Sequence, residues 1–537
     1  MKHNHKKSSG NLVELVVEQI EKHPHREALR IPVAWSNDAV TRYETATFGE
    51  MGRKIASYQR GFRKAGYRPR DRVIIMIPPS VDLYCIIAAM LASGMIPVLV
   101  DISMGFRKML TAFDDSMAGA IITKQKFCRI RYFIPRLWKY RCYSVDGDGI
   151  GIRPISHLQE AGSHRIDIVP CDRETTGIIS FTSGSTGRPK GADRKHWGLK
   201  QQHLANRAIL PDRPGDIDMT AFPVYVLHNL ACGMPTLIAA VDFAAVKRVN
   251  PSLILQQIRE FKPTRLSAAP VFMKRVAEHI IHNKMRLPSM RLIVTGGAPV
   301  PRKLCAILRQ AFPGAEIRVV YGSTEAEPIS SISIDDILES VGEGFLVGKP
   351  YGFVRVKIVN LPPDHDSISD HTLERYTLQI GEIGEIVVAG DHVSRGYVAN
   401  PGPIGEYKIP CPDGSVWHRT GDTGYLDRKG RIWLTGRARD VVQHGGRLIH
   451  PYLLEKKIDE VPGVVRSAVV ASGTADRPIL AVVLDRTAKR EASLKAIREL
   501  MRGSDCDDIS IREMNRIPLD KRHNSKIDRP ALIKMLD

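Results

Sequence analysis

The chain has 537 residues, 43% of them hydrophobic and 25% charged, which is longer than one hydrophobic core usually supports and ordinary for a water-soluble globular protein. Its eight cysteines are scattered and form no CxxC pair, so we expect reduced thiols in a cytoplasmic protein, without a disulfide framework or a zinc site. The net charge of +20 is spread along most of the chain, which indicates a generally basic surface, and no nucleic-acid recognition motif accompanies it.

The N-terminal region contains no segment that predicts export or membrane insertion. Apolar residues between positions 12 and 20 recur at helical spacing with glutamates among them, which predicts an amphipathic helix and not the apolar core of a signal peptide. The longest uncharged run, residues 83–100, is broken by Ser93-Gly94 and by Pro97. We therefore expect a helix, a turn and a strand there, and no membrane span.

One stretch combines cations with aromatic residues. Residues 124–141, KQKFCRIRYFIPRLWKYR, carry seven Lys or Arg side chains, no acidic residue and five aromatic rings. The plainest interpretation is a basic surface helix beside half-buried aromatics. The alternative is a peripheral contact with an anionic membrane, such as the inner surface of the cell membrane, where rings lie at headgroup depth. Stacking on single-stranded nucleic acid is the least favoured interpretation.

Short apolar runs alternate with helix-like segments over most of the chain. These runs end near positions 77, 101, 124, 183, 270, 299 and 323. The alternation predicts an α/β fold of parallel sheets with crossover helices. In such a fold, ligands bind beyond the carboxyl ends of the strands.

The last third of the chain changes character. Residues 381–437 alternate short strands with turns, which predicts a β-rich subdomain. Strand-helix-strand character then continues to the end, which predicts a small α+β domain. We expect a large N-terminal domain over residues 1–436, a hinge at 437–440 and a small C-terminal domain over 441–537.

The turn FTSGSTGRPKG, residues 181–191, predicts a phosphate site. A strand leads into it, its glycines let the backbone approach an anion, and its amides and hydroxyls donate to phosphate oxygens. Arg188 and Lys190 add positive charge. The turn is not a Walker A loop, because Lys190 is followed by Gly191 and not by Ser or Thr.

Four stretches together resemble motifs of the adenylate-forming superfamily, which includes acyl-CoA synthetases, luciferases and peptide-synthetase adenylation domains. They are the turn above, YGSTEAEP (321–328), HRTGDTGYLDRKGRIWLTGRARD (418–440) and RHNSKIDR (522–529). The resemblance runs from about residue 20 to the C-terminus. It implies the fold of that superfamily, with a small mobile C-terminal domain. It also implies a reaction that joins a carboxylate to ATP, giving an acyl-adenylate and pyrophosphate, before a second nucleophile displaces AMP.

The resemblance implies an ATP site with three parts. The β- and γ-phosphates would be held by Thr182, Ser183, Gly184, Ser185, Thr186, Gly187 and Lys190. The adenine side of the nucleotide would be bound by Gly296, Gly297, Ala298, Tyr321, Gly322 and Ser323, with the Tyr321 ring against the base. Asp422, backed by Arg437, would accept hydrogen bonds from both ribose hydroxyls.

Catalysis, by the same resemblance, would fall to three residues. Thr324 would lie near the α-phosphate, and Glu325, helped by Thr182, would bind Mg²⁺ through hard oxygen atoms. Lys526 would bridge the carboxylate and the α-phosphate. Because Lys526 belongs to the small domain, we expect the domains to close about a hinge that contains Arg439.

The sequence departs from the common pattern of the superfamily in four places. In the acyl site, where Tyr225 and Gly297 would lie, Tyr225 is followed by Val226, and His228 comes two residues late. The hinge has Arg439 where Asp or Lys is common. Gln443 replaces a lysine that often serves the second half-reaction, and RHNS precedes Lys526.

These departures resemble one branch, the β-lactone synthetases of olefin biosynthesis and related fatty-acid–CoA ligase-like proteins. We expect an ATP- and Mg²⁺-dependent, AMP-forming ligase that activates a fatty acid, with coenzyme A as the favoured acceptor. The alternative is a β-lactone synthetase, in which the substrate's own β-hydroxyl attacks and no coenzyme A is needed. A catalytically silent homologue is a further alternative, against which Lys526, Glu325 and Asp422 argue.

Overall fold

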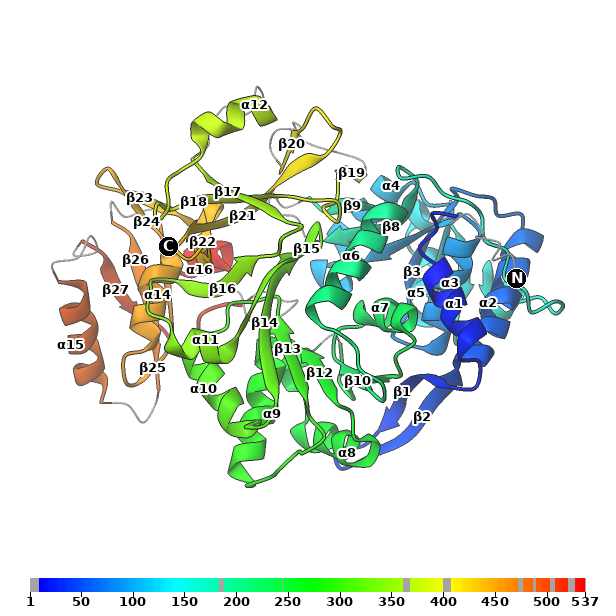
Figure 1. The fold of residues 1–537 in the computed structure, drawn as a ribbon, viewed down its shortest axis with the longest axis horizontal. Helices are drawn as coiled ribbons and strands as arrows, with labels where there is room; N and C mark the ends of the chain where they lie inside the picture. The colour runs from blue at the N-terminus through cyan, green and yellow to red at the C-terminus, as the bar shows by residue number, and fades with distance from the viewer. Residues whose placement is uncertain are drawn as a thin grey trace, which may run out of the picture.

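The computed structural model describes residues 9–182, 188–243, 245–360, 368–398, 407–471, 477–485, 489–502, 508–519 and 527–536. Two large sheets form the framework of the molecule, and the C-terminal elements lie at the opposite end from the N-terminus (Figure 1). No helix within the described ranges combines the length and the apolar character needed to cross a membrane.

The first sheet has eight strands and is mainly parallel. In sheet order they are β19 (Gly396–Val398), β9 (Lys190–Lys195), β8 (Thr176–Thr182), β4 (Ile96–Val100), β3 (Arg72–Met76), β5 (Ala120–Thr123), β6 (Arg141–Ser144) and β7 (Ile152–Pro154). The strands from β8 to β7 run parallel, whereas β9 and β19 run antiparallel at one edge. Helices on both faces explain why these strands read as continuous apolar runs.

The helix α3 (Val81–Ala92) lies at the centre of this half of the molecule. Every residue except Asp82 is buried, because the helix is apolar on all sides. Its first turn is closed by Ser80, whose hydroxyl accepts a hydrogen bond of 3.2 Å from the Leu83 amide. The uncharged run of residues 83–100 is thus a buried helix followed by the strand β4, as predicted.

The second sheet has fourteen strands. Thirteen of them, in sheet order, are β17 (Arg355–Val359), β18 (Gly384–Ala389), β21 (Val416–Leu426), β22 (Ile432–Arg437), β16 (Phe345–Pro350), β15 (Ala326–Ser333), β14 (Glu316–Ser323), β13 (Leu292–Gly296), β12 (Arg265–Ala268), β10 (Asp218–Thr220), β11 (Thr236–Ile238), β1 (Glu27–Trp35) and β2 (Val40–Thr47), and β20 (Lys408–Pro410) pairs with β21. The strands from β14 to β1 are parallel. The predicted β-rich section is therefore continuous with this sheet through the pairing of β16 with β22.

The helices of this large part cover the two sheets. They include α1 (Glu14–Lys22), α2 (Phe48–Lys64), α4 (Phe106–Ser116), α6 (His196–Ile209), α7 (Tyr225–Cys232), α8 (Pro251–Phe261), α9 (Pro270–His282), α10 (Arg302–Ala311), α11 (Ile334–Glu339) and α12 (Asp370–Leu373). The predicted α/β architecture, with large N-terminal sheets and a small C-terminal part, is confirmed.

The prediction of a single basic helix over residues 124–141 is wrong. The segment forms the short helix α5 (Gln125–Cys128) and two 3₁₀ turns, Arg129–Tyr132 and Pro135–Leu137. Pro135 prevents a continuous helix because it lacks the backbone donor. The aromatic rings divide between the core and the surface: Tyr140 is buried, whereas Phe133 is 86% exposed and Trp138 is 61% exposed.

The C-terminal residues build their own small cores. The strands are β23 (Val442–His444), β24 (Arg447–Ile449), β25 (Val464–Val470), β26 (Ile479–Leu484) and β27 (Ser510–Glu513), and the helices are α14 (Pro451–Asp459), α15 (Arg490–Met501) and α16 (Arg529–Leu536). Two apolar clusters in this region draw all their buried members from residues 442–532. This agrees with a boundary near residue 440, and the residue limits of the domains stay predictions.

A buried ion cluster connects the hinge to this region. The Arg529 side chain, 5% exposed as a residue, places its Nε 3.1 Å from Asp440 Oδ2 and its Nη2 2.8 Å from Glu455 Oε1. Arg529 also donates to the Val469 carbonyl oxygen at 3.3 Å. Its guanidinium therefore joins the end of the hinge, α14, β25 and α16.

Replacing Arg529 with Met should loosen the C-terminal region, because the buried Glu455 and the partly buried Asp440 lose their cation. The expected loss of local stability is about 3–5 kcal/mol. Hydrogen exchange with mass spectrometry should show faster exchange in α14, β25 and α16 and little change in β3–β5. The control Arg490→Met removes an exposed ion pair with Glu513 and should change exchange little. Unchanged protection in Arg529→Met would contradict this assignment.

Candidate active site

A cavity of about 2,700 Å³ opens where the carboxyl ends of strands from both sheets meet the C-terminal region. Strand ends line it from the first sheet at Val100 and Thr182, and from the second sheet at Gly296 and Ser323. Parallel strands present backbone groups and loops at this edge, which is where ligands bind in such folds. The sequence-predicted site residues that the structure describes gather here.

The ends of the predicted phosphate turn lie at this cavity. Ser183, Gly184, Ser185, Thr186 and Gly187 fall outside the described residues, as does Lys526. Thr182 ends β8 and pairs across the two strands with Lys190, which begins β9, and both residues line the cavity. The Lys190 Nζ lies 3.1 Å from the centre of the Tyr407 ring. The phosphate-binding roles of residues 182–190 stay predictions.

The predicted ribose-binding pair is formed. Arg437 Nε lies 3.0 Å from Asp422 Oδ1, and the Tyr321 hydroxyl donates to Asp422 Oδ2 at 2.9 Å. Neighbouring positions on β21 and β22 explain the pair, because Asp422 and Arg437 lie opposite each other in the register. Asp422 and Arg437 line the cavity, and Tyr321 is 8% exposed. The structure thus reveals a hydroxyl–carboxylate contact of Tyr321 that the sequence did not predict.

The predicted adenine wall follows β13. Gly296 ends this strand, and a Cβ there would lie 2.4 Å from the Val320 carbonyl oxygen, so a larger residue would push β13 and β14 apart. Gly297 has a φ of +78°, a conformation that glycine adopts without strain. Gly296, Gly297, Gly322 and Ser323 line the cavity, while Ala298 is half-buried beside it.

Glu325 lies in a buried electrostatic cluster. The Tyr397 hydroxyl donates to Glu325 Oε1 at 3.0 Å. Burial acts to raise the pKa of Glu325, but Lys408 and the Tyr397 hydroxyl favour the ionised form, and the pKa is lowered overall. Burial lowers the pKa of Lys408 to about 7 and that of His418 to about 3. His418 begins the 418–440 motif, but the sequence predicted no role for it. Tyr397 and Lys408 lie outside all four motifs, so the sequence did not point to them.

The donor groups at this point fit Mg²⁺. Glu325 supplies an ionised carboxylate, Thr182 supplies a hydroxyl, and both line the same cavity. Mg²⁺ commonly takes one or two protein oxygens and completes its shell with water and phosphate oxygens. Thr324 lines the cavity next to Glu325, as its predicted position near the α-phosphate requires.

The predicted acyl-site residue Tyr225 contacts a carboxylate that the sequence did not single out. Tyr225 begins α7, and its hydroxyl donates to Glu327 Oε1 at 3.2 Å. Both residues line the main cavity, together with Gly297 and apolar residues such as Ile238 and Val294. Glu327 belongs to the motif YGSTEAEP, in which the resemblance implies a role for Glu325 but none for Glu327. His228 lies one turn further along α7, and its ring packs 4.8 Å from that of His203.

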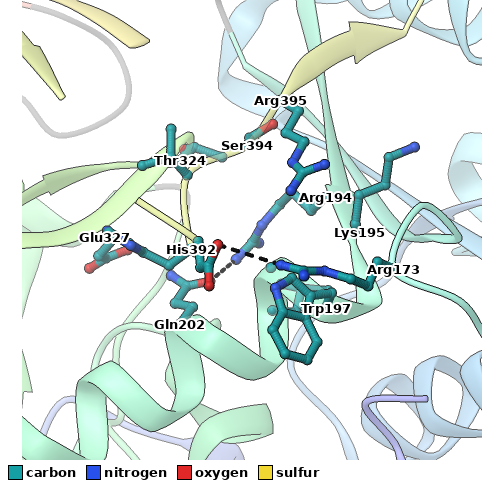
Figure 2. A pocket seen from close by; sticks show the side chains of 14 residues that line it. Arg173, Arg194, Lys195, Trp197, Gln202, Thr324, Glu327, His392, Ser394 and Arg395 are labelled. Atoms are coloured by element: carbon teal, nitrogen blue, oxygen red, sulfur yellow. Dashed lines mark hydrogen bonds and ion pairs between the residues drawn. The ribbon is translucent and has the colours of Figure 1, made fainter. Parts of the chain in front are cut away.

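A small neighbouring pocket lies behind Thr324 and Glu327 (Figure 2). Its cationic lining consists of Arg173, Arg194, Lys195 and Arg395. The Arg194 guanidinium bonds to Gln202 at 2.5 Å, and Arg173 lies 4.3 Å from the Trp197 ring centre. Arg194 also lines the main cavity, so it supplies positive charge to both spaces.

A protein-family model described as AMP-binding enzyme matches residues 16–398. The chain belongs to this family. The AMP-binding family explains the resemblance seen in the four motifs, and the predicted membership in the adenylate-forming superfamily is confirmed. The protein is accordingly an adenylate-forming ligase that activates a carboxylic acid with ATP, and Mg²⁺ is typical of such enzymes.

Two full-length relatives in the AMP-binding family carry the same description. The chain is 27% identical over 544 residues to an olefin beta-lactone synthetase of Stenotrophomonas maltophilia, covering 97% of each chain. It is 28% identical over 543 residues to an olefin beta-lactone synthetase of Xanthomonas campestris pv. campestris, covering 95% of this chain and 94% of the relative.

Solved structures share the fold. The amide bond synthetase McbA of Marinactinospora thermotolerans matches with a TM-score of 0.80 and 19% identity, over 98% of this chain and 99% of that chain. The o-succinylbenzoate coenzyme A synthetase of Bacillus subtilis, solved with ATP and a magnesium ion, matches with a TM-score of 0.75 and 21% identity, over 96% and 98% of the two chains. At this identity the likeness concerns the fold.

Replacing Asp422 with Asn should weaken ATP binding by about 10- to 100-fold, because hydrogen bonds to a charged acceptor contribute about 1.5–3 kcal/mol. Calorimetric titration with ATP measures the change. The control Asp427→Asn makes the same substitution in the β21–β22 hairpin, at a carboxylate that bonds Arg431 and Trp433 and does not line the cavity. If Asp422→Asn bound ATP as tightly as the unmodified protein, the ribose assignment would be wrong.

Proposed function

We propose that the protein is a β-lactone synthetase that activates a β-hydroxy fatty acid. The observation that carries the proposal is the Tyr225–Glu327 pair, which lines the main cavity beside apolar residues such as Ile238 and Val294. An unsubstituted acyl chain offers such polar groups nothing to bond, whereas a β-hydroxyl does. Similarity to two olefin beta-lactone synthetases over nearly the whole chain supports the proposal.

The first step requires an anionic carboxylate to approach a polyphosphate. We assign the β- and γ-phosphates to residues 182–190, the ribose to Asp422 and the base to the wall of Gly296, Gly297, Ala298 and Tyr321. Bound Mg²⁺, held by Glu325 and Thr182, would neutralise phosphate charge. Lys526 would bring a further cation to the carboxylate and the α-phosphate, and Thr324 would donate nearby. These cations and donors lower the repulsion between the two anions and align the attack.

The second step distinguishes the proposed activity from coenzyme A ligation. In the proposed reaction the β-hydroxyl oxygen attacks the acyl carbon, AMP leaves, and a four-membered lactone forms. Coenzyme A is therefore not a substrate in this proposal. The acyl-CoA ligase activity favoured by the sequence alone is the competing outcome.

Incubation with ATP, Mg²⁺ and a long-chain β-hydroxy acid should give pyrophosphate, AMP and the β-lactone without coenzyme A. Mass spectrometry of the extracted lipid and a pyrophosphate assay measure the products. The matched unsubstituted acid should give no lactone. Lys526→Ala should give neither pyrophosphate nor lactone while still binding ATP. Acyl-CoA formation that depends on added coenzyme A, with no lactone in its absence, would contradict the proposal.

The exposed part of residues 124–141 supports membrane contact. Four large side chains here are exposed: Phe133 by 86%, Trp138 by 61%, Tyr132 by 44% and Ile150 by 88%; we call them the aromatic patch. The Tyr132 hydroxyl donates to the Ile150 carbonyl oxygen at 2.9 Å, and the Trp138 indole donates to the Arg131 carbonyl oxygen at 2.7 Å. The same segment reaches the main cavity, which Lys126, Phe127 and Ile130 line. We propose that the aromatic patch rests on an anionic bilayer beside the cavity that receives the acyl chain.

Replacing Phe133 and Trp138 together with Ser should reduce binding to phosphatidylglycerol-containing vesicles at least about tenfold, because two rings no longer enter the interface. Vesicle cosedimentation measures binding, which salt should also weaken. The control replaces Val341 and Leu448, which are 95% and 62% exposed and lie outside the 124–141 segment, with Ser. Equal binding by the patch variant and the control would exclude this surface as the contact.

A further inference from the structure

We propose that Glu327 is the base that takes the proton from the β-hydroxyl when the lactone ring closes. This inference rests on the proposed β-lactone synthetase activity and adds the group that makes the hydroxyl nucleophilic. A neutral hydroxyl is a weak nucleophile, and a positioned base typically contributes about 10²- to 10⁴-fold to such a step.

The position of Glu327 follows from the β14–β15 hairpin. Ser323 and Ala326 pair at its end, so Thr324 and Glu325 form the turn. Glu327 follows on β15, where the buried Ala326 points away from the cavity and its two neighbours point toward it. The hairpin therefore presents Thr324, Glu325 and Glu327 to one cavity, with Glu327 on the side of Tyr225.

The short distance between the carboxyl group and the β-hydroxyl of the substrate favours a position of this hydroxyl near Tyr225 and Glu327. The β-carbon is two carbon–carbon bonds from the carboxyl carbon, which must lie near Thr324 when it joins the α-phosphate. In the predicted acyl site, the chain would continue along the wall that contains Gly297 and Tyr225, which both line the cavity. A β-hydroxyl on such a chain would then lie beside the Tyr225–Glu327 pair, and groups further along the chain would lie farther from it.

The surroundings of Glu327 suit a base. The carboxylate lines the main cavity, where a bound substrate can reach it. Tyr225 donates to Oε1 and so fixes the carboxylate against the cavity wall. Arg194, held by Gln202, lies on the side of the small pocket that Glu327 also lines (Figure 2).

The step is balanced without any further reactant. The hydroxyl oxygen forms a bond to the acyl carbon as its proton passes to the Glu327 carboxylate. The bond between the acyl carbon and the phosphate oxygen breaks, and its electron pair leaves with AMP. The protonated Glu327 then returns the proton to water in the cavity. Adenylation precedes this transfer and involves no proton from the hydroxyl.

The substitution Glu327→Gln tests the proposal because it keeps the size and polarity of the side chain but removes the base. In single-turnover experiments with a β-hydroxy acid, the lactone-forming rate should fall at least about 100-fold. Pyrophosphate should still be released in the first turnover, so the β-hydroxyacyl-adenylate should accumulate on the protein. Rapid quenching and mass spectrometry measure both species.

Two further variants make the result specific. Glu278→Gln changes another carboxylate that lines the same cavity and should leave lactone formation unaltered. Glu327→Asp moves the carboxylate by one methylene and should restore part of the lost rate, which a purely structural role would not predict. Thermal unfolding of each variant checks that the fold is retained.

The outcomes separate this inference from the proposed function. Lactone formation at an undiminished rate in Glu327→Gln would overturn the role of Glu327 and leave the β-lactone activity standing. Equal loss of adenylation with hydroxylated and unsubstituted acids would also overturn it, because the residue would then serve the site as a whole. If the unmodified protein made no lactone, the proposed function would fail and this inference with it.

Discussion

Three hydrogen bonds between phenol and carboxylate groups converge on the β14–β15 hairpin and hold the site together. Tyr321 on the hairpin donates to Asp422 on β21, Tyr397 of β19 donates to Glu325, and Tyr225 of α7 donates to Glu327. The partners come from both large sheets and from a helix. A hydrogen bond to a charged group is stronger than one between neutral groups, and its geometry is well defined. The hairpin thus fixes the predicted ribose, metal and acyl positions relative to one another.

Burial and charged neighbours shift the pKa values of the ionisable groups around this hairpin in different directions. The pKa of Glu325 is lowered because Lys408 and the Tyr397 hydroxyl favour its ionised form against the cost of burial. Burial disfavours the charged form of Lys408 and lowers its pKa to about 7. Glu327 has weaker compensation from Arg194, and its pKa is raised. Two carboxylates two residues apart thus lie in different electrostatic surroundings.

The sequence predicted what local patterns encode. Apolar runs predicted the parallel strands. The resemblance to adenylate-forming motifs implied that Arg437 backs Asp422, and the register of β21 and β22 forms this pair. Tyr397 and Lys408 were missed because they reach Glu325 from segments without a motif of their own. The single helix expected over residues 124–141 failed because positive charge and aromatic content say little about backbone shape, whereas Pro135 and short 3₁₀ turns decide it.

An ion pair lies at each end of the predicted hinge, residues 437–440. Arg437 is held at the ribose position by Asp422, and Asp440 is held in the C-terminal region by Arg529. Rotation of the small domain that kept both contacts would have to occur at Ala438 and Arg439. The Arg439 side chain is largely exposed, with 57% of its surface accessible, so its backbone can turn without opening a packed core. We therefore place the pivot of the proposed domain closure at these two residues, between one contact that retains the nucleotide and another that retains the fold of the moving part.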